Sequence, residues 1–219
     1  MLSIKLLGRM AVERDGEELT APASRRAWSL LAYLALHPGP QPRNELAARF
    51  WPDVLDSSAR ASLRSAIWAL RRTLEPFAPQ LLVAGREEVG LSAAEGELRV
   101  DALAFVALLD EGRDSEAVEL CDGELLSGFE EEWIDVVRET HRERLLGALE
   151  RLAAGCELSG DLAGAIVSSR RQAAVDPFGE EVHRRLIARL AASGDRGAAL
   201  LAYRTLSERL RRELAVAPS

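Results

Sequence analysis

The sequence predicts a mainly α-helical protein with a small amount of β-structure, divided into two domains. Three segments near the start carry apolar residues at helical spacing, and two short apolar runs follow them. Farther along, a seven-residue pattern occurs twice in a region that is helical throughout. We therefore expect an N-terminal domain at 1–97 and an all-α repeat domain at 98–219.

The chain opens with short apolar runs over residues 4–19, which Gly8 and the pair Asp15-Gly16 interrupt. Short runs separated by turn residues are typical of adjacent antiparallel strands. We expect a small antiparallel β-meander here.

Three helices follow the meander. The first is expected at 24–37, where Leu and Ala recur every three or four residues before a Pro-Gly-Pro stop. The second is short, at about 43–50. The third runs from about 58 to 74, with Ser57 as its N-cap and Pro76 just beyond its end.

A hairpin is expected after the third helix, because the runs at 80–84 and 88–91 flank Gly85-Arg86-Glu87. Three helices closed by a hairpin are the element order of a winged helix-turn-helix, in which the hairpin is the wing.

From Asp101 onward the pattern is helix after helix, and one internal repeat can be counted. The segment 159–165 (SGDLAGA) recurs at 193–199 (SGDRGAA), and 193 − 159 = 34 residues is the period of a tetratricopeptide helix pair. Such repeats stack into a superhelix that usually binds proteins or peptides. The second domain is therefore expected to be tetratricopeptide-like.

The third helix has two chemically different faces. At about 100° per residue, four apolar residues share an arc of about 60° that must pack on the other helices. These are Leu63, Ile67, Leu70 and Leu74. The other half of the helix carries Arg60, Ala61, Arg64, Ser65, Trp68, Arg71 and Arg72.

The arginine-rich face suits DNA. A guanidinium group donates two hydrogen bonds to guanine or binds a phosphate, and the small Ala61 and Ser65 allow close approach to base edges. A solvated amphipathic helix would show the same arginine spacing. Trp68 favours the DNA interpretation because an exposed indole usually has a partner, although Trp68 could instead pack into the core.

The net charge of −7 belongs to the second half of the chain. Residues 1–97 carry 12 basic and 12 acidic side chains, whereas residues 98–219 carry 16 and 23. A local basic stripe matters more for DNA than the overall charge. The acidity therefore does not exclude a nucleic-acid-binding N-terminal domain.

Segments 24–34 and 58–74 resemble the first helix and the recognition helix of the response-regulator type of winged helix; the second ends in Leu-Arg-Arg-Thr-Leu. The second half resembles a bacterial transcriptional activator domain. The segments that carry this second likeness are Leu125–Phe129, Glu132-Trp133, Arg142–Leu145, Gly160-Asp161, Asp176-Pro177, Ala199–Tyr203 and Arg211–Leu214. Together they resemble the SARP-type transcriptional activators of actinobacteria.

That resemblance implies a regulator that binds direct repeats in double-stranded DNA as a side-by-side pair, a homodimer on DNA. It would recruit RNA polymerase through its sigma factor. It places Arg64, Ser65 and Trp68 against the bases, where Ala61 is also expected. The phosphate contacts are expected from Arg60, Arg71, Arg72 and Arg43, with Arg86 at the tip of the wing.

Two features depart from the resemblance. The wing tip has two acids, Glu87 and Glu88, beside Arg86, where a minor-groove contact prefers positive charge. An adaptor whose winged helix binds protein is therefore the alternative. Relatives also continue with another helix beyond Ser219, so we expect a fragment or a short member with apolar surface exposed on its last helix.

No catalytic, cofactor or metal site is expected. The sequence has no phosphate-binding glycine motif, and His37, His141 and His183 lie far apart without ligand spacing. No apolar stretch approaches the roughly 20 residues that span a bilayer, and no signal peptide is apparent. Cys121 and Cys156 are both expected in helices as small apolar residues, which suits the cytoplasm.

Overall fold

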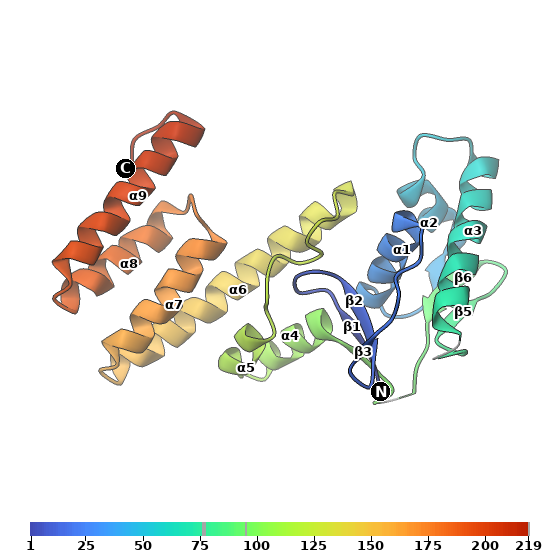
Figure 1. Cartoon of the computed structure of the whole chain (residues 1–219), viewed down its shortest axis with the longest axis horizontal. Helices are drawn as coiled ribbons and strands as arrows, with labels where there is room; N and C mark the ends of the chain where they lie inside the picture. Colours follow the sequence, from blue (N-terminus) through green and yellow to red (C-terminus); the bar gives the residue numbers. More distant parts are fainter. Residues whose placement is uncertain (76–77, 95, 219) are drawn as a thin grey trace. The chain divides into compact units, whose positions relative to one another are not determined.

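The computed structural model describes residues 1–75, 78–94 and 96–218. It contains two compact units, residues 1–110 with 119–138, and residues 111–118 with 139–219. Figure 1 follows the chain from the short strands near the N-terminus to the row of helices near the C-terminus. The predicted fold class, mainly α with a small β part at the start, is confirmed.

A four-stranded sheet opens the first unit, in the order β3-β2-β1-β7. The strands β1 (Leu2–Lys5) and β2 (Ala11–Arg14) are antiparallel, and β3 (Glu17–Glu18) pairs with β2. The expected meander is thus confirmed. The sequence did not indicate β7 (Leu98–Val100), which joins the sheet parallel to β1.

The three expected helices of the first unit are present. Helix α1 is Arg25–Leu36, α2 is Arg43–Phe50 and α3 is Asp56–Leu74. The Ser24 side chain caps α1 by accepting a hydrogen bond from the Ala27 amide. All four apolar residues of the α3 stripe are buried. The helix-turn-helix is therefore built on the core that the periodicity predicted.

The expected cap of α3 is wrong. Leu55 is the N-cap and Ser57 lies inside the first turn, where Asp56 supplies a negative charge toward the helix dipole. The Leu55 carbonyl accepts hydrogen bonds from the amides of Ser58 and Ala59. The helix thus starts without a side-chain cap, two residues before the expected position. Pro76, expected beyond its end, lies outside the described residues.

The expected hairpin is confirmed as β5 (Leu82–Ala84) and β6 (Glu88–Leu91), and β4 (Gln41–Pro42) extends it to a three-stranded sheet. At Gly90 this sheet passes so close to the turn after α1 that a β-carbon would lie 2.8 Å from the Gly39 carbonyl oxygen. Only glycine allows this approach of the wing to the first helix.

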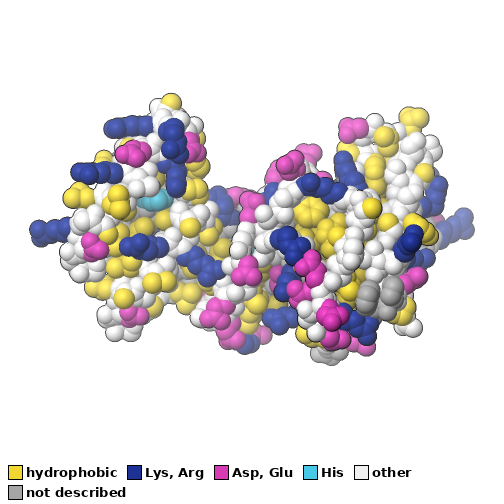
Figure 2. Space-filling model, in the orientation of Figure 1, with side chains coloured by type: hydrophobic (Ala, Val, Ile, Leu, Met, Phe, Trp, Pro, Cys, Tyr) yellow, Lys and Arg dark blue, Asp and Glu magenta, His cyan; other side chains and the backbone are white. Residues whose placement is uncertain are grey.

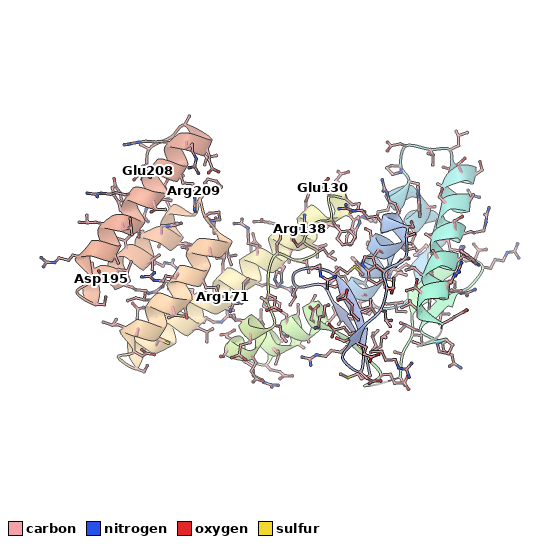
Figure 3. The ribbon with its side chains drawn as sticks, in the orientation of Figure 1. Glu130, Arg138, Arg171, Asp195, Glu208 and Arg209 are labelled. Carbon is pink, nitrogen blue, oxygen red and sulfur yellow. The ribbon has the colours of Figure 1, made fainter. Side chains whose placement is uncertain are left out.

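The chain was expected to be helical from Asp101 onward, but much of the segment 101–138 is not. Helix α4 (Asp101–Asp110) and the short α5 (Asp114–Glu119) are followed by a loop that also holds Cys121, so the expected helix at Cys121 is wrong. The Arg138 guanidinium donates to the carbonyl oxygens of Leu125, Leu126 and Phe129 and holds the loop (Figure 3). These hydrogen bonds satisfy carbonyl groups of the loop that a helix would otherwise satisfy within its own backbone.

The boundary between the two compact units does not lie at residue 97. The segment 98–110 packs with the first unit because β7 pairs with β1, and the start of α6 (Glu132–Leu158) joins it because Trp133 stacks edge-on against Tyr33. The expected domains, 1–97 and 98–219, stay a prediction about functional modules.

The second unit contains the later part of α6, α7 (Leu162–Val175), α8 (Glu180–Ala192) and α9 (Arg196–Leu214). No helix among the described residues has the length and apolarity to cross a membrane.

The two copies of the repeated sequence form the same turn. Asp161 caps α7 by accepting from the Gly164 amide, and Asp195 caps α9 by accepting from the Ala198 amide, both at 2.9 Å. The glycine before each aspartate has a positive φ, 81° at Gly160 and 87° at Gly194, which glycine adopts without strain. The helix pairs α6–α7 and α8–α9 are thus structural repeats at a spacing of 34 residues, since 195 − 161 = 34.

Candidate nucleic-acid interface

The exposed face of α3 carries the residues that sequence analysis selected. Arg60, Arg64, Ser65, Trp68, Arg71 and Arg72 are exposed, and Ala61 is half-buried. Figure 2 shows basic side chains on the side of the view occupied by α3. The structure therefore brings these seven residues together on one helix face, opposite the buried leucines.

The arginines of this face differ in what they already contact. Arg60 forms an ion pair of 3.9 Å with Asp56, and its side chain is 63% exposed. Among the residues that the structure describes, Arg64 and Arg71 have no ion pair or hydrogen-bond partner. An exposed guanidinium without a protein partner keeps all its donors available to an anion or a base edge.

Trp68 projects into solvent, 63% exposed, and is not folded back into the core. The Arg72 guanidinium lies 5.6 Å from the centre of its ring, within the range of a cation–π interaction. Trp68 and Arg72 line the same surface depression as Arg64 and Ser65. The Ser65 hydroxyl donates to the Ala61 carbonyl oxygen one turn earlier, at 3.2 Å.

An open groove of about 1120 Å³ lies beside this face. One wall is the segment Leu19–Ser24, which leads into α1, and the other is α3. The α3 wall consists of Ala61, Arg64, Ser65, Trp68, Ala69, Arg72 and Thr73. Sequence reasoning missed this wall, because residues 20–24 have no periodic pattern and reach α3 only through the tertiary fold.

Arg43, at the start of α2, is tied to the wing. Its Nη1 donates to the Gly85 carbonyl oxygen at 3.2 Å, and its amide donates to the Glu87 carbonyl oxygen at 2.8 Å. The side chain is half-buried. Arg43 thus anchors the turn of the hairpin, and a phosphate contact for it stays a prediction.

The wing tip is exposed and of mixed charge. The Arg86 side chain is 96% exposed and lies 3.6 Å from the Glu87 carboxylate, which is 85% exposed. Glu88 is exposed as well. Water screens such a pair strongly, so Arg86 remains able to exchange Glu87 for another anion.

Aromatic and cationic contacts fix α1 against α2. Tyr33 stacks on His37 with ring centres 4.0 Å apart and meets Phe50 edge-on at 5.8 Å. The Arg26 guanidinium donates to the Phe50 carbonyl oxygen at 2.6 Å, which satisfies a group at the end of α2. These contacts hold the two helices that support α3.

The three histidines lie on different helices, His37 at the end of α1, His141 on α6 and His183 on α8. The part of the chain that the structure describes contains no group of three or more potential metal ligands. His141 is buried, and burial, together with the charge of Arg144, lowers its pKa to about 4. Burial and the nearby Arg209 also lower the pKa of His183. His183 is buried as well, so both histidines take part in the packing of the helices.

A family model described as the bacterial transcriptional activator domain matches residues 100–219, more than half of the chain. The chain belongs to this family. The family resemblance predicted from the sequence is confirmed. No curated protein matches the sequence. The bacterial transcriptional activator domain covers every helix from α4 to α9, including the repeated turns.

The chain is also similar to a solved structure, "Mycobacterium tuberculosis EmbR in complex with low affinity phosphopeptide". The sequences are 22% identical, the TM-score is 0.73, and the match covers 100% of this chain and 62% of the EmbR chain. The likeness shows that the two share a fold over the whole length of this member of the bacterial transcriptional activator domain family. The chain thus spans less than two thirds of the EmbR chain.

Proposed function

We propose that this transcriptional activator family member binds double-stranded DNA sequence-specifically through α3. The observation that carries the proposal is the exposed α3 face, with the unpaired Arg64 and Arg71 on either side of Trp68 among the described residues. The buried leucine face fixes this helix in a helix-turn-helix, the arrangement that places a recognition helix in the major groove.

The roles of the α3 residues follow from reach and chemistry. Arg64 and Ser65 read base edges, with Trp68 and the small Ala61 in apolar contact with the groove floor, such as a thymine methyl group. Phosphates on either side are bound by Arg60, Arg71, Arg72 and Arg43. The wing residue Arg86 enters the neighbouring minor groove after exchanging its contact with Glu87.

The regulator acts as an activator in this proposal. Two copies lie side by side on direct repeats of a promoter, and they recruit RNA polymerase through its sigma factor. Membership of the bacterial transcriptional activator domain family supports this assignment. Tetratricopeptide-like repeats, which generally bind proteins, supply a surface suited to polymerase contacts.

A genome-fragment pull-down with the purified chain tests DNA reading. Fragments recovered at two salt concentrations are sequenced for the chain and for the variant Arg64→Ala/Arg71→Ala. Arg99→Ala is the control, because Arg99 is also exposed and lacks a described partner but lies on β7. We expect the chain to enrich fragments that share a direct repeat. Arg99→Ala should keep this enrichment, and the variant Arg64→Ala/Arg71→Ala should lose it.

One observation favours a second function, a protein-binding adaptor. The wing tip exposes Glu87 and Glu88 around a single arginine, and acidic groups repel phosphates. In the genome-fragment pull-down, an adaptor should enrich no DNA sequence at either salt concentration. That result would contradict the proposed DNA binding and favour the adaptor function.

A further inference from the structure

The exposed face of α3 offers a restricted set of chemical groups to a base pair. Between Arg60 and Arg72 the sequence contains no Asn, Gln, Asp or Glu. Asn and Gln are the side chains that form two hydrogen bonds to adenine, and Asp and Glu accept a hydrogen bond from cytosine. The acid at the start of the helix, Asp56, already pairs with Arg60 at 3.9 Å. This face therefore lacks the specific readers of adenine and cytosine.

Arg64 is the guanidinium of this face that suits guanine. Among the residues that the structure describes it has no ion pair or hydrogen-bond partner, and the sequence has no carboxylate within one turn of it along α3. At about 100° per residue, Arg60 and Arg71 lie nearer to the buried leucine face than Arg64 does. Guanine presents two neighbouring acceptors, O6 and N7, which match two donors of one guanidinium. Arg64 thus complements a guanine, and the two outer arginines suit phosphates.

Trp68 presents apolar surface one turn after Arg64. Its side chain is 63% exposed. The groove beside it is lined by Ala61 and Ala69 of α3 and, on the opposite wall, by residues 21–23, and its described lining residues include no acid. In the major groove, thymine is the standard base that projects a methyl group. Trp68 therefore suits the C5-methyl group of a pyrimidine.

Ser65 adds little choice between bases. Its hydroxyl donates to the Ala61 carbonyl oxygen at 3.2 Å, so its oxygen is left to accept a hydrogen bond. Both adenine and cytosine present an amino group that could donate this bond. The choice of bases consequently depends on Arg64 and Trp68.

The spacing of Arg64 and Trp68 limits the distance between the two bases. Four residues of an α-helix advance about 6 Å along its axis. Successive base pairs of B-DNA are about 3.4 Å apart. A helix in the major groove therefore places these two side chains within about two base steps of each other.

We propose that α3 reads its operator through a guanine and a C5-methyl group that lie within about two base steps. Arg64 donates to O6 and N7 of the guanine, and Trp68 packs on the methyl group. The inference rests on the DNA-binding function proposed above. Thymine supplies the methyl group in unmodified DNA. Because 5-methylcytosine carries the same group at the same position, methylation of a cytosine should replace a thymine at this step.

The test uses the full chain and a library of DNA duplexes with about 20 randomised base pairs. Bound duplexes are sequenced, and we expect a sequence in which a guanine and a thymine lie within two base steps. This duplex is then made with 7-deazaguanine, which lacks N7, and with uracil, which lacks the methyl group of thymine. Two further duplexes carry cytosine or 5-methylcytosine in place of the thymine, each paired with guanine. Fluorescence anisotropy gives the affinities.

Each modified duplex has an expected effect on the unchanged chain. 7-Deazaguanine should weaken binding about tenfold, because one of the two bonds from Arg64 is lost. Uracil should weaken it about fourfold, as expected for one methyl group returned to water. 5-Methylcytosine should bind about fourfold more tightly than cytosine at the same position.

Variants assign each effect to a side chain. Trp68→Ala should respond to uracil by less than about twofold while keeping the full effect of 7-deazaguanine, and Arg64→Ala should show the reverse. Arg99→Ala is the control, because Arg99 lies on β7, and it should respond to both analogues as the unchanged chain does. Circular dichroism verifies that these exposed substitutions keep the fold.

Several results would overturn the inference. A selected sequence to which the chain binds equally with thymine and uracil would exclude methyl reading and leave sequence-specific DNA binding in place. A uracil effect that Trp68→Ala retains in full would remove Trp68 as the methyl reader, and a 7-deazaguanine effect that Arg64→Ala retains would remove Arg64 from guanine. A selection that enriches no sequence would contradict the proposed DNA binding, and the inference with it.

Discussion

Arg189 of α8 and Glu150 of α6 form a bidentate ion pair, with Nη1 and Nη2 3.1 and 2.7 Å from the carboxylate oxygens. Arg189 is 5% exposed and also meets Glu157 at 3.1 Å. The pair connects two helices of the second unit that are 39 residues apart in the sequence. Burial acts to raise the pKa of Glu150, but the hydrogen bond from Arg189 and the charge of that arginine lower it below its usual range.

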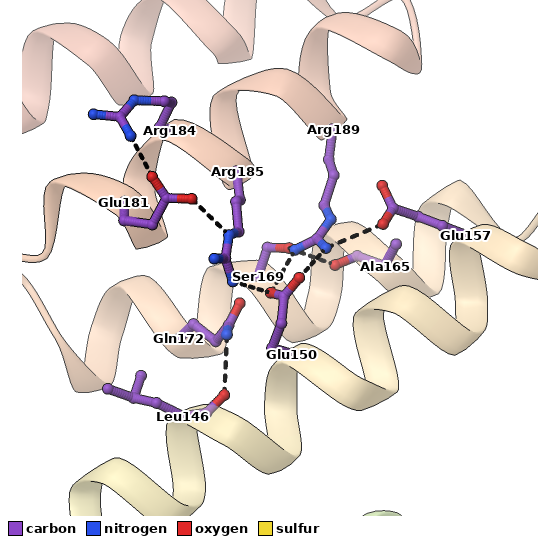
Figure 4. Close-up of polar contacts among 10 residues, drawn as sticks. All are labelled: Leu146, Glu150, Glu157, Ala165, Ser169, Gln172, Glu181, Arg184, Arg185 and Arg189. Atoms are coloured by element: carbon purple, nitrogen blue, oxygen red, sulfur yellow. Dashed lines mark hydrogen bonds and ion pairs between the residues drawn. The ribbon is translucent and has the colours of Figure 1, made fainter.

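Removing Arg189 should destabilise the chain. Arg189→Met removes the donor to Glu157 and to the Ser169 hydroxyl, and leaves Glu150 with the 3.5 Å ion pair to Arg185 (Figure 4). We expect a cost of about 1–3 kcal/mol in the free energy of unfolding. Urea unfolding followed by circular dichroism measures this cost. The control is Arg184→Met, because the exposed pair of Arg184 with Glu181 should be worth less than about 0.5 kcal/mol. Equal losses in both variants would contradict the role of Arg189.

His141 should make the free energy of unfolding depend on pH. Its pKa is about 4 in the folded chain and about 6.5 when unfolded, so the unfolded chain binds the proton first as pH falls. Stability is therefore complete above about pH 6.5 and declines toward pH 4, by about 2 kcal/mol at pH 5. His141→Leu should reduce the loss between pH 7.5 and pH 5 by that amount in urea unfolding. An identical pH profile for His141→Leu would exclude the buried imidazole as the cause.

Local patterns predicted the elements whose partners are near in sequence. The leucine stripe of α3 identified its buried face because one helix has a fixed period. The SGD turns identified the repeat because Asp161 and Asp195 each bond an amide three residues ahead. The same periodicity predicted the arginine face of α3. Because one stripe of the helix is buried, residues on its other side are exposed.

Elements whose partners are far away in sequence escaped prediction. Strand β7 has three residues and pairs with β1 across more than ninety positions, a contact that no local pattern encodes. Trp133 was part of a family motif, yet its packing against Tyr33 of α1 needs the tertiary fold. The groove wall at 19–24 is a third case, since its residues form a groove only when the tertiary fold places them beside α3.

Arg64 should carry sequence discrimination. Arg64→Ala is expected to lose about 1–3 kcal/mol of the preference for operator over random DNA, because a bidentate contact to a base edge is removed. Competition binding against both DNAs measures the ratio of affinities. A loss of the same size on both DNAs would assign Arg64 to a phosphate instead.

Arg71 should contribute to the affinity for DNA without distinguishing operator from random sequence. Arg71→Ala is expected to weaken operator and random DNA alike, and to reduce the slope of log affinity against log salt concentration by about one. Titrations over a series of salt concentrations give this slope, with Arg99→Ala as the control that should retain it. An unchanged slope in Arg71→Ala would remove this residue from the phosphate contacts.

Trp68 should report DNA binding directly. Trp28 and Trp133 are buried, 8% and 9% exposed, and Trp51 is half-buried, so Trp68 at 63% should dominate quenching of the tryptophan fluorescence by acrylamide. Bound DNA should cover its indole and lower the quenching constant toward that of the variant Trp68→Ala. The free energy of unfolding of Trp68→Ala should stay within about 0.5 kcal/mol, because few core contacts are lost at an exposed position. Quenching that operator DNA leaves unchanged would place Trp68 outside the interface, and the reading face of α3 would then have to lie nearer Arg60 and Arg64.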